Sequence, residues 1–213
     1  MPISRYFDIA LLLALVGLGV LGISRAIVFY RRGIQVVSAD RQRSFGQTVA
    51  DTTAGICLLV WGYEVIAYGF AVPFHIGPTV AHAEFLPAPI LKAVGVLLAF
   101  AAVLLYGVGL KHLGEAWRLG VDRDKAGPLV TSGIYAWTRH PIYVAFDLIF
   151  VGTFLVHSGW LFLLLVLVWL PLMHQTMLRE EEFLSKKFGD EYMRYRQRVG
   201  RYITLSNRTI HES

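Results

Sequence analysis

The residues best suited to bind a charged small molecule fall into two short clusters in the C-terminal half of the chain. The first cluster is the run Arg139-His140-Pro141-Ile142-Tyr143. Pro141 suits the first turn of a helix, where its missing N–H would have no partner, so we expect a helix to begin there. The free N–H groups of a helix N-terminus attract anions. His140 can add a hydrogen bond, and the ring of Tyr135 or Tyr143 can lie against an aromatic or cationic ligand. The alternative is a capped helix with tyrosines at a membrane interface.

The second cluster is the adjacent carboxylates Glu180 and Glu181, which follow a long apolar stretch. Neighbouring residues do not share a helix face, so at least one of these carboxylates turns away from solvent or toward a partner. A ligand that carries a positive charge or hydroxyl groups would be such a partner. The alternative is a solvated helix start.

The elements that position both clusters are predicted to be membrane helices, because the apolar residues of the chain come in blocks too long for a soluble core. The chain is 55% hydrophobic, and its mean hydropathy is +0.54. A helix needs about 20 apolar residues to cross about 30 Å of hydrocarbon. We therefore predict one all-α integral membrane domain over residues 1–213, a bundle of about five transmembrane helices. They are placed at residues 6–30, 48–72, 87–110, 142–156 and 160–173, so that three lie in residues 1–112. The last two form a hairpin of short spans.

The distribution of Lys and Arg predicts the orientation of these helices. The first loop contains Arg31, Arg32, Arg41 and Arg43, and the third contains Lys111, Arg118, Arg123, Lys125 and Arg139. Loops 73–86 and 157–160 contain no Lys or Arg. Cytosolic loops carry the excess of basic residues, so the N-terminus and these two loops should be extracytoplasmic, with both clusters on the cytosolic side. The net charge of +5 favours anionic lipid head groups over nucleic acid as a partner.

Two ionisable residues, Glu64 and Asp147, lie deep within the predicted spans. Charges are costly in hydrocarbon, so these residues should face protein, water or a partner, in a functional or a helix-pairing role. Asp8, Arg25, Asp51 and Lys92 lie near span ends, where capping or snorkelling explains them. The histidines show no paired metal-ligand spacing beyond the loose pair His75 and His82, and we predict no metal. Cys57 should serve packing.

An amphipathic segment follows the second cluster. Its apolar residues recur at intervals of three and four: Leu184, Phe188, Tyr192, Tyr195, Val199 and Tyr202. Basic residues surround them, which is typical of a segment at a membrane interface. We expect Gly189 to end one helix and Asp190 to cap the next. The segment then either folds back over the site as a lid or lies on the membrane surface.

The order and spacing of these motifs resemble the isoprenylcysteine carboxyl methyltransferase family. The shared pattern is Gly-x-Tyr, then Arg-His-Pro-x-Tyr, Glu-Glu, Phe-Gly, Tyr and Val-x-Arg, from Leu129 onward. That family comprises integral membrane enzymes that transfer a methyl group from S-adenosylmethionine. The resemblance implies that residues 113–213 are the cofactor-binding catalytic half. The implied cofactor contacts are Leu129, Val130, Tyr135, His140, Pro141, Ile142, Tyr143 and Glu180. Glu181 joins them as the neighbouring carboxylate, and we expect His140 and Glu180 to lie outside the core.

The chain departs from the family pattern at the substrate arginine. The enzymes that act on prenylated proteins have an arginine four residues before the first Glu, where this chain has Thr176. Residues three apart are neighbours on a helix, so Arg179 can take over this role. We therefore predict Arg179 and Glu180 as the catalytic residues. Gly200 in place of Pro, and Ala145 in place of Gly, are interpreted as packing changes.

The predicted function is an S-adenosylmethionine-dependent methyltransferase. It would act on a lipophilic, isoprenoid-like substrate, a carboxylate, that enters from the bilayer at the cytosolic face. Methyl transfer from a sulfonium requires alignment and desolvation of the reactants and no nucleophilic triad. Three alternatives stay open: a phospholipid or amine N-methyltransferase, an NADPH-dependent membrane reductase of the sterol reductase type, and a non-enzymatic membrane scaffold. The compact size and short loops favour a bacterial inner membrane.

Overall fold

The computed structural model describes residues 3–32, 44–114 and 128–204, and all regular structure in these ranges is helical. The long helices are α1 (Ser4–Arg31), α2 (Phe45–Phe70), α3 (Pro89–Leu113), α4 (Pro141–Val156) and α5 (Trp160–Phe188). The shorter elements are η1 (Thr79–His82), η3 (Gly133–Ala136) and α6 (Asp190–Arg198). The predicted all-α class is confirmed. The predicted basic residues Arg41, Arg43, Arg118, Arg123 and Lys125 lie outside the described ranges.

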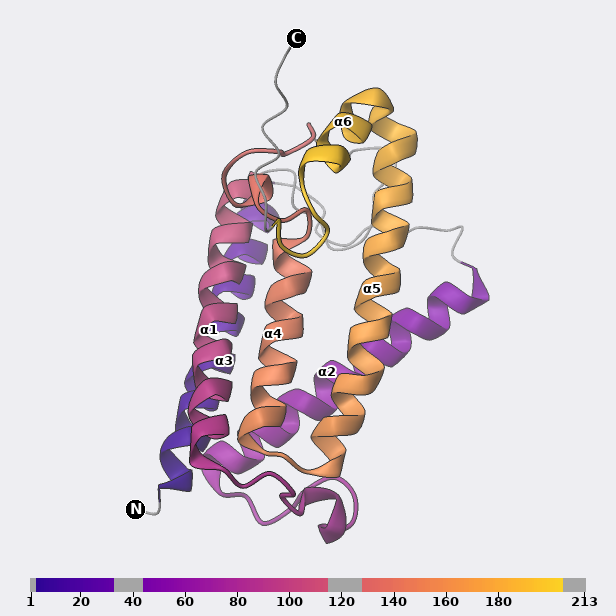
Figure 1. The fold of residues 1–213 in the computed structure, drawn as a ribbon. Helices are drawn as coiled ribbons and strands as arrows, with labels where there is room; N and C mark the ends of the chain where they lie inside the picture. The colour runs from indigo at the N-terminus through magenta and orange to yellow at the C-terminus, as the bar shows by residue number, and fades with distance from the viewer. Residues whose placement is uncertain (1–2, 33–43, 115–127, 205–213) are drawn as a thin grey trace.

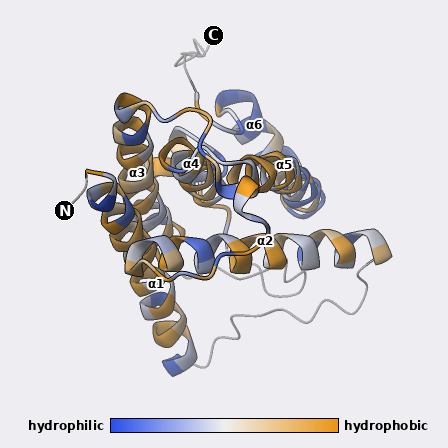
Figure 2. Ribbon diagram, turned by 90° about the horizontal axis from the view of Figure 1, so that it is seen from below, coloured by the Kyte–Doolittle hydropathy of each residue, from blue (hydrophilic) through white to orange (hydrophobic). Residues whose placement is uncertain are grey.

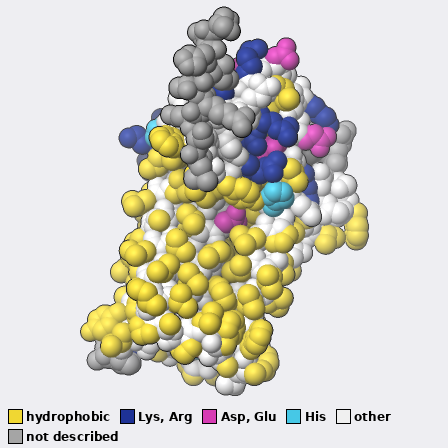
Figure 3. Space-filling model, viewed as in Figure 1, with side chains coloured by type: hydrophobic (Ala, Val, Ile, Leu, Met, Phe, Trp, Pro, Cys, Tyr) yellow, Lys and Arg dark blue, Asp and Glu magenta, His cyan; other side chains and the backbone are white. Residues whose placement is uncertain are grey.

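The chain is a multi-pass integral membrane protein. Helices α1, α2, α3 and α5 are long and apolar enough to cross a membrane, and α4 is a shorter apolar helix of 16 residues. On the face shown in Figure 3, apolar side chains cover most of the side of the bundle, while most basic and acidic side chains gather at the end that carries α6. Helix length and hydropathy, which do not depend on tertiary contacts, explain why the first four predicted spans agree closely with the observed helices.

Helix α5 differs from its prediction. The predicted span ends at residue 173, but the helix continues through Pro171 and Met173 to Phe188. Membrane helices tolerate an internal proline because neighbouring groups satisfy the freed backbone. The extension beyond the apolar part is rich in helix-forming Glu, Lys and Leu, and Glu182 pairs with Lys186 one turn on, at 2.5 Å. This extension carries the second cluster of charged residues out of the apolar band.

The helices alternate in direction, so that the two ends of the bundle carry different segments (Figure 1). The N-terminus, the connection that contains η1 and the α4–α5 turn lie at one end. Helix α6, η3 and the C-terminal end of the described chain lie at the other. Helix α2 runs obliquely across the bundle, from α1 at one end toward α5 (Figure 2). The segments predicted to be extracytoplasmic therefore share one end, and the two site clusters share the other.

Helices α3 and α4 form the closest pair in the bundle because glycines line their contact. A Cβ atom on Gly152 would lie 2.6 Å from the carbonyl oxygen of Gly95 and 3.2 Å from the backbone nitrogen of Ala99. Small residues let membrane helices approach closely, which replaces the hydrophobic driving force that lipid does not provide. Gly107 and Gly109 give α3 further close contacts, since a Cβ atom on them would meet Leu21 and Ile142.

Stacked aromatic rings join α2, α4 and α5 in the core. The ring centroids of Phe150 and Trp169 are 4.2 Å apart, and those of Trp61 and Phe150 are 5.2 Å apart. The indole N–H of Trp61 donates a 3.0 Å hydrogen bond to the buried hydroxyl of Thr153, so its polar atom is satisfied. Cys57 is buried in the same core, as predicted.

We predict that Gly152→Ala destabilises the bundle. The added methyl group would meet the α3 backbone, so the helices must separate, and overpacking of this kind costs about 1–3 kcal/mol. A lower melting temperature of the detergent-solubilised protein is the expected result. Gly62→Ala is the matched control, because a Cβ there meets nothing within 4 Å and alanine favours a helix. Equal melting temperatures for Gly152→Ala and wild type would contradict the proposed close contact.

Candidate active site

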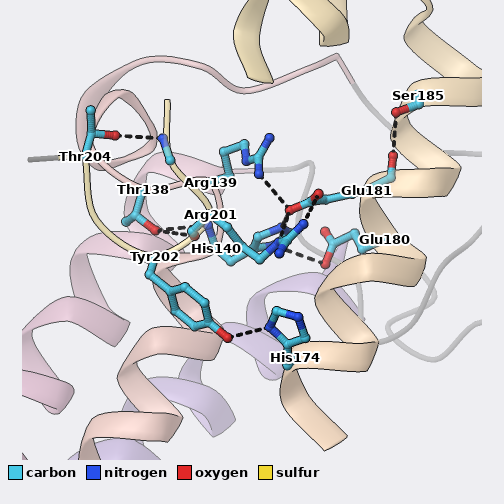
Figure 4. Close-up of polar contacts among 11 residues, drawn as sticks. Thr138, Arg139, His140, His174, Glu180, Glu181, Ser185, Arg201, Tyr202 and Thr204 are labelled. Carbon is cyan, nitrogen blue, oxygen red and sulfur yellow. Dashed lines mark hydrogen bonds and ion pairs between the residues drawn. The ribbon is translucent and has the colours of Figure 1, made fainter. Parts of the chain in front are cut away.

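Glu181 is the centre of a buried polar cluster at the end of the bundle that carries α6 (Figure 4). Arg201 donates two hydrogen bonds to its carboxylate, from Nε at 2.7 Å and from Nη2 at 2.9 Å. Arg139 Nη2 lies 3.0 Å from the same carboxylate, and His140 Nε2 lies 3.2 Å from it. Only 3% of Glu181 is exposed. Paired hydrogen bonds from a planar guanidinium are among the strongest polar contacts in proteins, so this cluster has a fixed geometry.

The surroundings of Glu181 keep it ionised. Burial raises the pKa of its carboxyl group, but hydrogen bonds from Arg201 and His140 and the charge of Arg139 outweigh burial and hold the pKa well below its usual value. The hydrogen bond to Glu181 raises the pKa of Arg201, while burial lowers the pKa of Arg139. The negative charge of Glu181 therefore compensates two guanidinium groups, one of them buried.

Three segments that are distant in the sequence bring these side chains together. Arg139 and His140 precede α4, Glu181 lies on the α5 extension, and Arg201 comes from the segment 199–204. Backbone contacts tie that last segment down: Arg139 N–H donates to Gly200 O at 3.0 Å, and Thr204 N–H donates to Trp137 O at 2.9 Å. The Thr138 hydroxyl donates to Arg201 O at 3.1 Å. The position of Arg201 is therefore set by the backbone as well as by its charge.

Helix α6 turns back onto the cluster. Gly189 has φ 51°, a left-handed conformation that favours glycine, and it ends α5 as predicted. The predicted cap at Asp190 is wrong: Gly189 occupies the N-cap position without a side-chain hydrogen bond, because the turn leaves Asp190 already inside α6. The apolar face of α6 packs on protein, in a cluster of Tyr192, Tyr195, Val199, Leu129, Leu184 and Phe188. The Tyr195 hydroxyl donates to Tyr135 O at 2.7 Å. Of the two alternatives for this segment, the structure favours the cover over the site.

The predicted cofactor contacts lie around this cluster. Tyr135, His140 and Pro141 are buried, and Leu129, Val130, Ile142 and Tyr143 are half-buried. The rings of His140 and Tyr143 meet edge to face, with centroids 5.6 Å apart. His140 Nδ1 lies 3.7 Å from the Glu180 carboxylate. The structure thus brings together the His-Pro-x-Tyr run and the glutamate pair. The expectation that His140 lies outside the core is wrong, since its ring contacts Glu181 and the residue is only 3% exposed.

The two adjacent glutamates have different environments, as the helix geometry predicted. Both oxygens of Glu181 bind side chains of the chain itself. The Glu180 side chain is 34% exposed. Glu180 therefore presents a carboxylate at the edge of the cluster, where a bound molecule can reach it.

Arg179 lies on another face of α5. Its Nη1 is 3.9 Å from Asp51 on α2, and the two side chains are 30% and 45% exposed. Thr176 uses its hydroxyl to donate to Leu172 O at 2.9 Å within the same helix. The guanidinium of Arg179 is thus near an acidic partner on α2.

The predicted cofactor contacts and catalytic residues included neither Arg139, although it begins the first cluster, nor Arg201. Both fall within the recognised motifs, Arg-His-Pro and Val-x-Arg, so their motif position was the available signal. The predicted site also did not include the pair of His174 and Tyr202, whose Nδ1 and hydroxyl are 2.7 Å apart on the membrane side of the cluster. Asp147 on α4 lies near Tyr202, and its Oδ1 is buried without a hydrogen-bond partner among the described residues.

Several buried polar atoms of the cluster have no partner within the described chain. They are Nε and Nη1 of Arg139 and the hydroxyl of Tyr192. Pro141 occupies the first turn of α4, as predicted, and that N-terminus has no side-chain cap. Buried donors are normally paired, so unpaired ones beside an uncapped helix N-terminus are suited to an anionic group of a ligand.

Comparison with known proteins gives the class of this site. The model of a family described as phospholipid methyltransferase matches residues 90–191. Protein-S-isoprenylcysteine O-methyltransferase from Schizosaccharomyces pombe is 35% identical over 112 residues, 52% of this chain and 45% of that protein. The enzyme from Rattus norvegicus is 33% identical over 51% of this chain and 39% of its own length. Form B of the enzyme from Arabidopsis thaliana is 32% identical over 53% of this chain and 55% of its own length. Each match spans less than two thirds of the relative.

The fold has a solved counterpart. The structure of the eukaryotic intramembrane Ras methyltransferase, isoprenylcysteine carboxyl methyltransferase, covers 80% of this chain, and 55% of that chain is matched. The TM-score is 0.50 and the sequence identity is 21%, which shows a shared fold. The resemblance predicted from the motifs is confirmed: residues 90–191 match the model of a methyltransferase family, and the similar curated proteins are isoprenylcysteine methyltransferases by name.

We predict that Glu181→Gln loosens the C-terminal cover. The substitution removes the charge that compensates Arg139 and Arg201, and loss of one partner of a buried ion pair costs about 3–5 kcal/mol. Faster trypsin cleavage at the basic residues of α6 and a lower melting temperature should result.

The neighbouring substitution Glu182→Gln is the control. Glu182 is 66% exposed and pairs with Lys186 on the same helix, so the change should cost less than about 1 kcal/mol. Cleavage rates that are equal in the two variants would show that Glu181 does not hold the cover.

Proposed function

We propose that this chain is a membrane methyltransferase that transfers a methyl group from S-adenosylmethionine to a lipophilic acceptor. One observation carries the proposal: the charged cluster around Glu181 is built mainly from residues within the segment matched by the methyltransferase family model. The cluster lies at the end of an apolar bundle, so an acceptor dissolved in the bilayer can approach it from the side. The curated relatives are all O-methyltransferases by name.

The residues present fit this cofactor. The unpaired nitrogens of Arg139 and the N-terminus of α4 suit its carboxylate. The half-exposed carboxylate of Glu180 suits an ammonium group or ribose hydroxyls. The rings of Tyr135 and Tyr143 would lie against adenine or the sulfonium. When bound, S-adenosylmethionine supplies an electrophilic methyl group on sulfur.

The protein's own contribution is to position the reactants and exclude water. Helix α6 and segment 199–204 cover the polar cluster, and Glu181 holds His140 and both arginines in place. A dry site with fixed dipoles favours a displacement in which charge is dispersed. We propose Glu180 as a cofactor contact, and Glu181 as a positioning residue that acts through His140 and Arg139.

The acceptor is proposed to be a lipophilic carboxylate, with Arg179 as its cation. A lipid amine is a second candidate, and two observations favour it. Arg179 already lies near Asp51, and the half-buried Asp147 lies near Tyr202 with Oδ1 unpaired among the described residues, where it would suit a cationic or proton-releasing acceptor. We further propose that the cluster faces the cytosol at a bacterial inner membrane rich in anionic lipid, because loops 73–86 and 157–160 contain no Lys or Arg.

We predict that S-adenosylhomocysteine raises the melting temperature of the detergent-solubilised protein and that NADPH does not. Ligands that bind only the folded state stabilise it by mass action. Stabilisation by NADPH instead would support a reductase, and stabilisation by neither ligand would contradict an enzyme of either kind.

Glu180→Gln should weaken binding of S-adenosylhomocysteine about ten- to a hundredfold, because one charge-assisted hydrogen bond is lost. Glu182→Gln should bind like wild type, and unchanged affinity in Glu180→Gln would reject the proposed site.

The acceptor is tested with Arg179→Ala. Supplied with a radiolabelled methyl donor and an S-isoprenylcysteine acid, the wild type should form a labelled ester, and Arg179→Ala should lose this activity while its affinity for S-adenosylhomocysteine stays unchanged. Lys187→Ala, on the same helix, controls for the general loss of a positive charge. If instead a phospholipid amine is labelled, at equal rates in wild type and Arg179→Ala, the proposed carboxylate acceptor would be wrong and the lipid amine would take its place.

A further inference from the structure

Glu64 is a buried carboxylate at the end of the bundle opposite the candidate active site. It lies on α2 and is 0% exposed. Its oxygens accept hydrogen bonds from the backbone N–H of Ile76 at 2.6 Å and meet Nδ1 of His75 at 2.8 Å. Among the described residues no Lys or Arg forms an ion pair with it. A buried, ionised carboxylate requires a compensating cation. Here the neighbouring groups that can bind a metal cation are histidines.

The fold adds a third donor to the loose pair His75 and His82. Glu64 comes from α2, His75 from the connection after it, and His82 from η1. One ligand atom from each of the three lies within 4.8 Å of the others. We predicted no metal from the spacing of the two histidines in the sequence, because the third residue joins them only when this connection folds back onto α2.

The hydrogen bonds of His82 set the protonation of its ring. Its Nε2 lies 2.9 Å from the carbonyl oxygen of Ile76, and because a carbonyl only accepts, Nε2 carries the hydrogen. In the neutral ring Nδ1 then carries the lone pair, and it lies 3.1 Å from the Tyr68 hydroxyl. Histidines that bind metals usually donate their other N–H to a carbonyl or carboxylate in this way. His82 is thus held in the form that a metal ion requires.

Aromatic rings surround the space between the ligand atoms of Glu64, His75 and His82. The ring centroids of His75 and His82 are 5.1 Å apart, and Tyr68 packs 4.6 Å from His75. The Tyr68 hydroxyl therefore lies beside the donors and offers a fourth ligand atom. The side chain of His75 is 27% exposed, so an ion has access from solvent at this end of the bundle.

We propose that Glu64, His75 and His82 bind a divalent transition metal ion of the zinc type, with Tyr68 or a water molecule as the fourth ligand. Imidazole nitrogen with one carboxylate is a ligand set that suits zinc and disfavours Mg²⁺ and Ca²⁺. Ligand bonds of about 2.0–2.2 Å place tetrahedral donors about 3.4 Å apart. On metal binding, the distance of 2.8 Å between Glu64 Oε2 and His75 Nδ1 must increase slightly. The longest distance between ligand atoms, at most 4.8 Å, must decrease.

A metal ion at this site would be structural. It would compensate the charge of Glu64 and bind the α2–α3 connection to α2, at the opposite end of the bundle from Glu181. This inference does not depend on the proposed methyl transfer, because none of its ligands belongs to the candidate active site.

The test uses the full chain, free of any histidine tag, solubilised in detergent and treated with a chelator. Titration with Zn²⁺ should show binding of one ion per chain and a raised melting temperature, whereas Mg²⁺ should change neither. Substitution of Co²⁺ should give the visible absorption of a tetrahedral cobalt site. Glu64→Gln and His82→Ala should each weaken Zn²⁺ binding by more than the roughly 10- to 100-fold that loss of an outer partner costs.

The variants are chosen so that a folding defect does not hide the answer. In Glu64→Gln the amide oxygen still accepts the Ile76 N–H, and His82 is only half-buried. His112→Ala, an exposed histidine at the other end of the bundle, should bind Zn²⁺ like wild type. Absence of Zn²⁺ binding to the wild type would overturn the proposal, as would wild-type affinity and cobalt absorption in both site variants.

Discussion

A buried carboxylate that stays ionised needs positive charge around it, and Glu181 imposes this requirement on the end of the bundle that carries α6. Arg139 and His140 must arrive from the residues before α4, and Arg201 must arrive from the segment after α6. Helix α5 must extend past the apolar band to deliver the glutamate itself. The turn at Gly189 and the packing of the apolar face of α6 serve the same requirement, because they bring the chain back toward Glu181 and so place Arg201 beside it.

The membrane shapes the rest of the bundle by a different rule. Lipid offers no hydrophobic gain for joining two apolar helices, so contact depends on close approach and on satisfied polar atoms. Gly95 and Gly152 provide the close approach between α3 and α4. The Trp61–Thr153 hydrogen bond provides a polar tie between α2 and α4. The site therefore rests on helices whose positions are set by fit, which suits a reaction that depends on alignment.

The sequence predicted those features that local rules decide. Span positions follow from hydropathy, and the start of α4 follows from Pro141, so both agree with the structure. The end of α5 was missed because Glu, Lys and Leu continue a helix without an apolar signal. Burial of His140 and the role of Arg201 depend on a contact between residues far apart in the chain, which no local pattern records. The same holds for Glu64 and His82, which meet only because η1 folds back onto α2.

The late position of Arg201 has a consequence for biosynthesis. Ribosomes make the chain from the N-terminus, so α4 and α5 enter the membrane before Arg201 exists. Until that residue emerges, Glu181 has only Arg139 and His140 as partners, and the apolar face of α6 has not yet found Leu129. The polar cluster around Glu181 is therefore completed last, on helices that have already entered the membrane. A nascent chain can be anchored in the bilayer well before this cluster is complete.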